Sequence, residues 1–480
     1  MEAVLLIDFG STNTKVTAVD PAEARLLGTA AAFTTVGTDI GEGLAEALGL
    51  LQKETGPLTF VKRFACSSAA GGLRMAASGL VPSLTASAAR LAALGAGAKI
   101  VGLYSYELTE EDGAAIAALK PDIFLLTGGV DGGNKDCILH NAAVLAAMKP
   151  AFPVLVAGNR AASGQCLKIL AGLEVIPCPN VLPRLGKLNI EPVQEQIRAL
   201  FLRRIINARG LSREQELISG ILMPTPSAVK RALELLAQGM AGEKERKGET
   251  GKIEKREKRE NGEQGFGELA AVDLGGATTD VYSVASGLPQ TGDTVLKGIP
   301  EPFSKRTVEG DIGMRYSAAG VLEAAGAERL AALSGLPQEA VEQAVRELAS
   351  RPDAVAGTPE EEALDYALAA AAVEAAMERH AGTLEEAYTP AGPVFVQTGK
   401  DLRNVGRLIL TGGAVIRSKR AGEIAGYARY TKAKPHALKP AGGELYVDKA
   451  YILAAMGLLA ETAPGAALRI MKREIQRYGT

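Results

Sequence analysis

The chain has 480 residues, of which 47% are apolar and 22% charged, a composition typical of a globular protein with several domains. The net charge of −2 does not favour nucleic acid or an anionic membrane as a partner, and the absence of tryptophan does not favour stacking on bases. No apolar run approaches the ~20 residues that span a bilayer, and the four cysteines form no Cys-x-x-Cys pair. We therefore expect a cytoplasmic protein with reduced thiols.

The first predicted elements are two strands joined by a turn of small and polar residues. Residues 3–7 form an apolar run, and apolar residues alternate with polar ones after the turn. Glycine lets backbone N–H groups approach a ligand closely and hydroxyl groups add donors, so the turn suits phosphate oxygens. The phosphate-binding candidates are Gly10, Ser11, Thr12, Asn13 and Thr14. Asp8, which ends the first strand, is a candidate ligand of hydrated Mg²⁺.

Strand and helix patterns then alternate, which predicts a mostly parallel sheet with helices on its faces. The expected strands are residues 60–66, 99–104, 123–127 and 153–157. The expected helices are residues 44–52, 69–77 after a glycine-rich turn, 86–94, 110–119, 136–148, 193–206 and 228–238.

A glycine pair follows the strand expected at residues 123–127. Gly128 and Gly129 predict a tight turn, with or without a ligand. If the glycine-rich loop that continues from them faces a nucleotide, Asp131 is the candidate catalytic acid that orients the attacking water.

Residues 243–267 consist mainly of Lys, Arg, Glu and Gly, with few apolar side chains to bury. This composition predicts a disordered, charged insertion or a solvated helix. Because both signs of charge are mixed, the segment does not indicate a nucleic-acid arm.

A second hairpin then repeats the first one. Residues 269–272 are apolar, and the turn after them reads Asp273-Leu-Gly-Gly-Ala-Thr-Thr-Asp280. Its phosphate-binding candidates are Gly275, Gly276, Ala277, Thr278 and Thr279. Asp273 matches Asp8, so the pair is predicted to organise one Mg²⁺ ion from two half-sites.

Lys15 and Asp280 have the same offset from these two aspartates. Lys15 either reaches a β- or γ-phosphate as a point charge, which would make it catalytic, or lies in solvent. Asp280 is a third metal candidate, through an ordered water molecule.

The remaining segments complete the duplication. Residues 318–381 are rich in Ala, Glu and Leu and predict a helical insertion, strands are expected at 394–397 and 408–410, and a closing helix at 448–459. Gly412, Gly413 and Ala414 follow a strand as Gly128 and Gly129 do, which argues for two domains of one pattern. These three residues are the candidate adenosine site, and the alternative is a turn without a ligand.

The two hairpins and the late Thr-Gly-Gly turn resemble the phosphate-1, phosphate-2 and adenosine motifs of the actin, heat-shock chaperone and sugar kinase ATPase superfamily. Within it, the chain resembles the MutL-type accessory proteins of glutamate mutase (methylaspartate mutase). The segments that carry this resemblance are residues 5–15, 67–73, 126–134, 272–281 and 306–317.

The resemblance implies an α/β fold with two ribonuclease H-like (actin-like ATPase) domains around a nucleotide cleft. Domain I would cover residues 1–190, a helical connector 191–242, the charged insertion 243–267, and domain II 268–480 with its helical subdomain at 318–381. It also implies ATP and Mg²⁺ as cofactors and the subunits of an adenosylcobalamin-dependent mutase or aminomutase as partners. The expected function is ATP-dependent reactivation of that mutase, with slow ATP hydrolysis.

Two other functions stay open at this point. A small-molecule kinase of the same superfamily would need a base in the cleft, and Asp131 is the candidate. An ATP-dependent activator of a radical dehydratase would bridge an iron–sulfur cluster with paired cysteines, for which Cys166 and Cys178 are the candidates. A P-loop and a dinucleotide-binding glycine motif after the first strand are both missing from the sequence.

Overall fold

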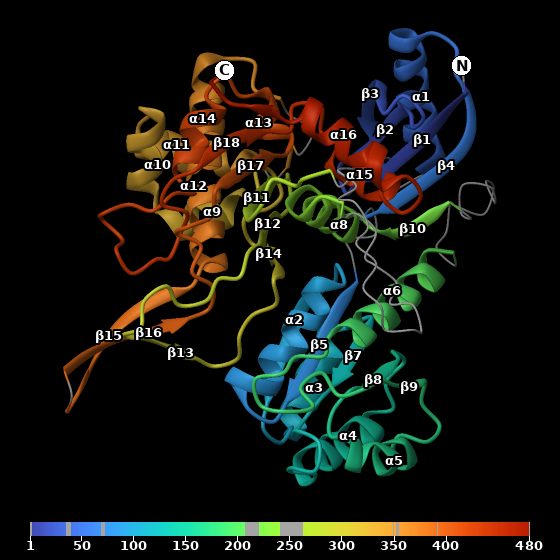
Figure 1. Ribbon diagram of the computed structural model, residues 1–480, viewed down its shortest axis with the longest axis vertical. Coiled ribbons are helices and arrows are strands. Elements are labelled where there is room, and N and C mark those ends of the chain that lie inside the picture. Colours follow the sequence, from blue (N-terminus) through green and yellow to red (C-terminus); the bar gives the residue numbers. More distant parts are fainter. Residues whose placement is uncertain are drawn as a thin grey trace, which may run out of the picture.

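The computed structural model describes residues 2–34, 40–68, 73–206, 220–240, 263–348, 350–351, 355–390 and 392–479. Two of its sheets have the same architecture and face each other across the upper part of the molecule (Figure 1). A third, parallel sheet lies below them, and a small three-stranded sheet projects as an arm.

The first sheet has the strand order β10-β4-β1-β2-β3. β2 runs antiparallel to β1 and β3, whereas β4 is parallel to β1 and β10 is parallel to β4. The strands are β1 (Glu2–Phe9), β2 (Asn13–Asp20), β3 (Arg25–Phe33), β4 (Thr59–Ser67) and β10 (Ile221–Pro224). Helix α1 (Ile40–Thr55) packs on β2 and β3.

The second sheet repeats this order as β14-β12-β11-β17-β18 and adds the short strand β19. β12 runs antiparallel to β11 and β14, and β17 and β18 continue parallel to β11. The strands are β11 (Leu269–Leu274), β12 (Thr279–Val284), β14 (Ser304–Glu309), β17 (Arg407–Thr411), β18 (Glu444–Val447) and β19 (Gln476–Arg477). Both sheets are therefore ribonuclease H-like, which confirms the predicted fold class.

The third sheet is entirely parallel, with the order β6-β5-β7-β8-β9. Its strands are β5 (Arg74–Gly79), β6 (Lys99–Ser105), β7 (Ile123–Leu126), β8 (Val154–Val156) and β9 (Val175–Pro177). The π-helical turn η1 (Pro82–Ala86) leads into α2 (Ser87–Gly95), and α3 (Glu110–Leu119), α4 (Asp136–Met148) and α5 (Arg160–Ile169) complete this domain.

Helices join the two ribonuclease H-like sheets into one core. α6 (Glu191–Ile206) packs on α2 and β10, while α8 (Thr225–Gln238), α15 (Leu453–Leu459) and α16 (Pro464–Glu474) contact one another between the sheets. Buried side chains of β1, β11, α8 and α15 form one hydrophobic cluster there. Because this apolar cluster spans both halves, they are connected by packed core as well as by the chain.

The helical insertion of the second half contains α9 (Ala318–Ala325), α10 (Ala327–Ser334), α11 (Gln338–Leu348) and α12 (Pro359–His380). Thr358 and Glu361 form a capping box at the start of α12, and thirteen of its residues are buried. The arm consists of β13 (Thr294–Lys297), β15 (Thr383–Thr389) and β16 (Gly392–Thr398), and α13 (Gly413–Arg417) and α14 (Ala421–Gly426) follow β17.

Two sequence predictions were wrong, and a third lies mostly outside the described residues. The helix expected at 69–77 is replaced, in its described part, by β5, which pairs between β6 and β7. The closing helix begins at Leu453, because Asp448 accepts hydrogen bonds from the N–H groups of Ile452 and Leu453 before the helix starts. Residues 243–262 of the expected insertion lie outside the described part of the chain. Among the residues that the structure describes, no helix is long and apolar enough to cross a membrane.

Candidate functional site

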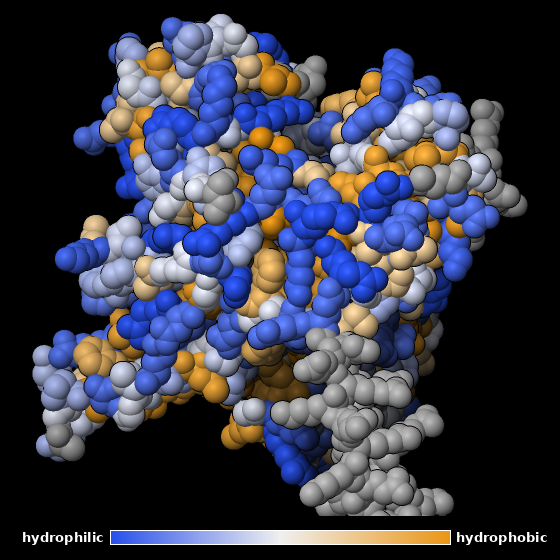
Figure 2. All heavy atoms as spheres, turned by 45° about the horizontal axis from the view of Figure 1, so that its top comes forward, coloured by the Kyte–Doolittle hydropathy of each residue, from blue (hydrophilic) through white to orange (hydrophobic). Residues whose placement is uncertain are grey.

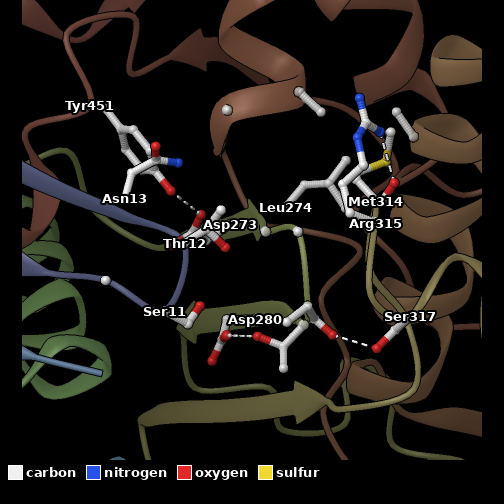
Figure 3. A pocket seen from close by; sticks show the side chains of 18 of the residues that line it. Ser11, Thr12, Asn13, Asp273, Leu274, Asp280, Met314, Arg315, Ser317 and Tyr451 are labelled. Carbon is white, nitrogen blue, oxygen red and sulfur yellow. Dashed lines mark hydrogen bonds between the residues drawn. The ribbon is translucent and has the colours of Figure 1, made fainter. Parts of the chain in front are cut away.

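The turns of the two repeated hairpins line one cavity of about 1010 Å³. Ser11, Thr12 and Asn13 come from the first turn, and Asp273 lies beside them at the end of β11 (Figure 3). In the space-filling view a notch separates the two upper lobes of the molecule (Figure 2). The structure thus brings the two predicted half-sites together, although they are far apart in sequence.

Asp8 is buried and accepts hydrogen bonds from three parts of the first domain. Lys15 Nζ lies 3.0 Å from Oδ2, and Thr225 Oγ1 lies 2.6 Å from Oδ1. Cys66 Sγ lies 3.5 Å from the same Oδ1. β1 and β2 place Asp8 directly opposite Lys15, and the N-terminus of α8 supplies Thr225.

Asp273 lies in the cleft without an equivalent cation from its own sheet. Its strand partner is Asp280, and Tyr451 donates a hydrogen bond of 3.4 Å to its Oδ1. Burial, together with the carboxylates of Asp280, Asp8 and Asp448, raises the pKa of Asp273 to about 7, although Lys15 opposes the shift. A half-buried carboxylate with other carboxylates around it can accommodate additional positive charge.

Lys15 and Tyr451 connect the two half-sites. The Lys15 ammonium lies 3.6 Å from the centre of the Tyr451 ring, a cation–π contact. Burial by itself lowers the pKa of Lys15, but the negative charges of Asp8 and Asp273 and the contact with Tyr451 together outweigh it and hold the pKa above the ordinary value. Lys15 therefore stays charged and faces the cleft, so the alternative of a solvated lysine does not describe its position.

Glycine is required at one position in each turn. A Cβ on Gly10 would lie 2.5 Å from the carbonyl oxygen of Asn13, and one on Gly275 would lie 2.7 Å from that of Thr278. The Gly10 and Gly275 N–H groups donate to these same carbonyls, so each turn is closed by its own backbone.

Most of the predicted phosphate-binding residues line the cleft, but two do not. The cavity is bounded by Gly10, Ser11, Thr12, Asn13, Gly275, Gly276, Ala277 and Thr278. Thr14 and Thr279 are fully buried instead: the Thr14 hydroxyl pairs with that of Thr34, and the Thr279 hydroxyl donates to the Ile312 carbonyl. Their side chains support the turns from behind.

Asp280 lines the cavity but is engaged by a buried arginine. Arg306 Nε on β14 lies 2.7 Å from Asp280 Oδ1. The same guanidinium donates through Nη1 to the carbonyls of Leu94 and Ala98, at 3.1 and 3.3 Å. Arg306 therefore connects the cleft to the end of α2 in the domain of the parallel sheet.

The other end of the cavity fits the predicted adenosine site in part. Gly413 and Ala414 line it, whereas Gly412 does not. A Cβ on Gly412 would lie 2.2 Å from the carbonyl oxygen of Leu274, so Gly412 packs against β11. Gly412 has a φ of +107°, a backbone conformation that favours glycine, so its role is to form the turn. Arg420 stacks on the Tyr366 ring at 3.4 Å and forms a wall that the sequence did not indicate.

Asp131 does not reach this cleft. It lines a different cavity, and its Oδ1 accepts from the Arg160 N–H and from Asn180 Nδ2, each at 2.9 Å. The loop after β7 turns toward β8 and not toward the hairpins. The structure therefore gives Asp131 no position from which to orient an attacking water.

Sequence reasoning also missed three residues of the cleft: Thr225, Arg306 and Tyr451. Thr225 follows a strand and precedes Pro226, a helix-start signal that the prediction placed a few residues late. Arg306 begins one of the segments that carry the family resemblance, but nothing in the sequence marked it as a residue of the cleft. Tyr451 lies in a segment without a recognisable motif, and only the folded chain brings both residues to the hairpins.

Mg²⁺ and its nucleotide fit the donor set of this cleft. Among the described residues, no group of three or more His, Cys, Asp or Glu side chains is placed to hold a metal by itself. Mg²⁺ does not need such a cage, because it commonly uses one or two carboxylates, water and phosphate oxygens. Asp8 and Asp273 supply two carboxylates, and burial beside other carboxylates raises the pKa of Asp273, so a cation at this position would stabilise its charged form.

Comparison with known proteins gives one clear match. The family model described as MutL protein matches residues 4–475. Protein MutL of Clostridium tetanomorphum is 46% identical over 477 residues, which cover 98% of this chain and 99% of the relative. Ligand-bound xylulose kinase from Lactobacillus acidophilus has a TM-score of 0.35 at 12% identity, covering 99% of this chain and 93% of its own. Glycerol dehydratase reactivase has a TM-score of 0.30 at 10% identity, covering 96% and 99%. Scores this low carry no weight for the activity.

Proposed function

Because this chain belongs to the MutL protein family, we propose that it binds Mg·ATP in the cleft and serves as an accessory factor of an adenosylcobalamin-dependent mutase. Glutamate mutase is the first candidate partner, since the sequence resembles its accessory proteins. The observation that carries the nucleotide part is the convergence of the two matched turns on one cavity, with Asp8 and Asp273 connected through Lys15 and Tyr451.

The chain would bind the nucleotide mainly by position and charge. The N–H and hydroxyl groups of the two turns surround the phosphates, and Lys15 supplies a fixed positive charge. Bound Mg²⁺ would neutralise phosphate charge between Asp8 and Asp273. Phosphoryl transfer needs little more than positioning and electrostatic stabilisation, so a cleft rich in Gly and Thr suffices for slow hydrolysis.

The output of this cycle would be a change of shape. Each half of the site lies on its own sheet, so binding and loss of the γ-phosphate favour different separations of the halves. An adenosylcobalamin enzyme that has lost its adenosyl group holds an inactive cofactor in a closed site. A partner that binds the open mutase more tightly in one nucleotide state would shift it toward release of that cofactor.

Neither alternative function gains support from the structure. A kinase would need a base near its acceptor, and Asp131 lines another cavity. A cluster-bridging activator would need accessible cysteines, but Cys166 is fully buried.

The test uses glutamate mutase loaded with cyanocobalamin, which is inactive. Adding the chain, Mg·ATP and free adenosylcobalamin should restore mutase turnover, whereas Asp8→Ala and Asp273→Ala should abolish both the recovery and ATP hydrolysis. Asp131→Ala, outside the cleft, should behave as wild type. ATP hydrolysis at the wild-type rate in either cleft variant would contradict the nucleotide site. Normal hydrolysis without recovered turnover would contradict only the choice of partner.

A further inference from the structure

A second cavity, of about 630 Å³, lies at the carboxyl edge of the parallel sheet. Asp131 reaches it from the loop after β7, Arg160 from the start of α5, and Arg184 and Lys187 from the loop after β9. In open parallel sheets, ligands bind outside the carboxyl ends of the strands. The strand order β6-β5-β7-β8-β9 is one of the two common doubly wound orders that follow this rule.

The point where the strand order reverses, between β5 and β7, is closed by side chains. Thr127 Oγ1 at the end of β7 donates to the Ser78 carbonyl at the end of β5, at 2.7 Å. Thr127 also approaches the carbonyl of Thr85 in η1. The open part of this edge is therefore displaced to β7, β8 and the loop that follows β9, where the cavity is found.

The lining of this cavity carries an excess of positive charge. Among the described residues, Arg160, Arg184 and Lys187 have no carboxylate within ion-pair distance. The one acid present, Asp131, is engaged by the Arg160 N–H and the Asn180 side chain, and no ion pair to the three cations is formed in this part of the chain. The three cations are exposed around one hollow, so water screens their mutual repulsion, and an anion that enters between them is attracted by all three.

The loops that present these cations are fixed by two buried asparagines. Asn159 accepts from the N–H groups of Gly132 and Ala161 and donates to the carbonyls of Gly133 and Asn134. Asn180 holds the other side through the Gly129 carbonyl and Asp131. Because these amides are nearly fully buried and fully engaged, the cavity is preorganised and its shape does not depend on a ligand.

From these observations we infer that the cavity binds a small molecule that carries a phosphate group, independently of the nucleotide cleft. Guanidinium and ammonium groups are the usual partners of phosphate oxygens, and two guanidinium groups and one ammonium belong to residues that line this cavity, beside the N-terminus of the ten-residue helix α5. The volume lies within the ~300–1,000 Å³ of small-molecule pockets, so a phosphate ester fits as well as the free ion.

The test uses a reporter that the sequence itself allows. The chain has no tryptophan, and Leu185, between Arg184 and the rest of the loop, is 71% exposed. Leu185→Trp therefore gives one fluorophore beside the cavity. Pyrophosphate should change its emission saturably, and the change should persist in Leu185→Trp/Asp8→Ala, in which the nucleotide cleft is impaired.

Removing a cation should weaken this binding. Arg160→Gln or Lys187→Gln in the reporter background should raise the pyrophosphate Kd about tenfold each, the usual scale for a lost charged hydrogen bond. Lys168→Gln, at the far end of α5, is the matched control and should leave Kd unchanged. Circular dichroism verifies that the variants remain folded.

Two arms then distinguish the source of the phosphate. Tighter binding of ribose 5-phosphate than of inorganic phosphate supports an organic ester, and equal binding supports recognition of the phosphate alone. The proposal is overturned by an emission that does not saturate, by equal changes with sodium chloride at matched ionic strength, or by an unchanged Kd in both Arg160→Gln and Lys187→Gln.

Discussion

The two hairpins that frame the cleft share one register but differ in charge at the matched position. Lys15 lies opposite Asp8 in the first hairpin, whereas Asp280 lies opposite Asp273 in the second. In the first half Lys15 forms an ion pair with Asp8 of the same sheet and also faces the cleft. In the second half both matched residues are acids, and the compensating cation, Arg306, comes from the neighbouring strand β14. The repeated fold determines where ionisable groups lie, but not their sign.

This difference divides the work between the halves. Lys15 gives the first half a fixed positive charge that faces the cleft, whereas Asp273 in the second half has no such cation on its own sheet. Arg306 uses its remaining donors on two carbonyls at the end of α2, which adds a polar link between the second half and the parallel-sheet domain, whereas the first half shares a hydrophobic core with that domain. A change at Asp280 would therefore be transmitted to that domain through one side chain.

Removing Arg306 should give the largest effect on stability. Arg306→Met leaves Asp280, whose side chain is 13% exposed, without its cation and two carbonyls without these donors, which costs up to about 3–5 kcal/mol. Urea unfolding measures the loss. Arg346→Met, which breaks an exposed pair with Glu342, is the control and should change the free energy of unfolding by under about 1 kcal/mol. Adding Asp280→Asn to Arg306→Met should recover part of the loss, and a loss no larger than that of the control would refute the role of Arg306 as this link.

The sequence indicated the framework of the site because its signals are local. Each hairpin combines an apolar strand, a glycine turn and a terminal aspartate within about a dozen residues, and the structure has all of them where expected. What it could not indicate depends on packing between distant segments. Tyr451 reaches Asp273 from the far end of the chain, and Arg306 reads as an ordinary polar residue of an edge strand.

Asp131 and the helix predicted at residues 69–77 are two cases in which a local sequence signal was overruled by contacts with distant segments. The loop after β7 has the composition of a ligand-binding turn, but its contacts with Asn159 and Asn180 hold it beside β8 and away from the hairpins. Residues 69–77 suggested a helix, but from Arg74 onward the chain forms β5, which pairs between β6 and β7 in the parallel sheet. The pairing of β5 with β6 and β7 therefore outweighed the local helix propensity of this segment.

The charge shortage of the second half predicts a pH dependence of intermediate size. With a pKa of about 7, Asp273 is mostly protonated below neutral pH, and a cation must displace that proton. Mg·ATP affinity should therefore rise by up to about tenfold per pH unit from pH 5 toward 7 and then level off. Isothermal titration at several pH values measures this.

The same group should affect the stability of the ligand-free chain in the opposite direction. Because the folded-state pKa lies above the ordinary value, the folded state retains a proton that the unfolded chain has released, so this contribution to stability falls as pH rises toward about 7. Asp273→Asn removes the ionisation and should flatten both profiles. Wild-type profiles in Asp273→Asn would assign the effect to another group.

The smallest predicted effect tests whether the halves act together through Tyr451. The Tyr451 ring makes a cation–π contact with Lys15 of the first half, and its hydroxyl donates a long hydrogen bond of 3.4 Å to Asp273 of the second half. Tyr451→Phe keeps the ring and should weaken ATP binding only about two- to threefold, while Tyr451→Leu also removes the cation–π contact and should lose up to about tenfold. Combined with Lys15→Met in a double-mutant cycle, Tyr451→Leu should show a coupling energy of about 0.5–1 kcal/mol, because each change removes the same contact. Strict additivity would mean that the two half-sites bind the nucleotide independently, and that the opposite charges of the matched hairpins are not compensated across the cleft.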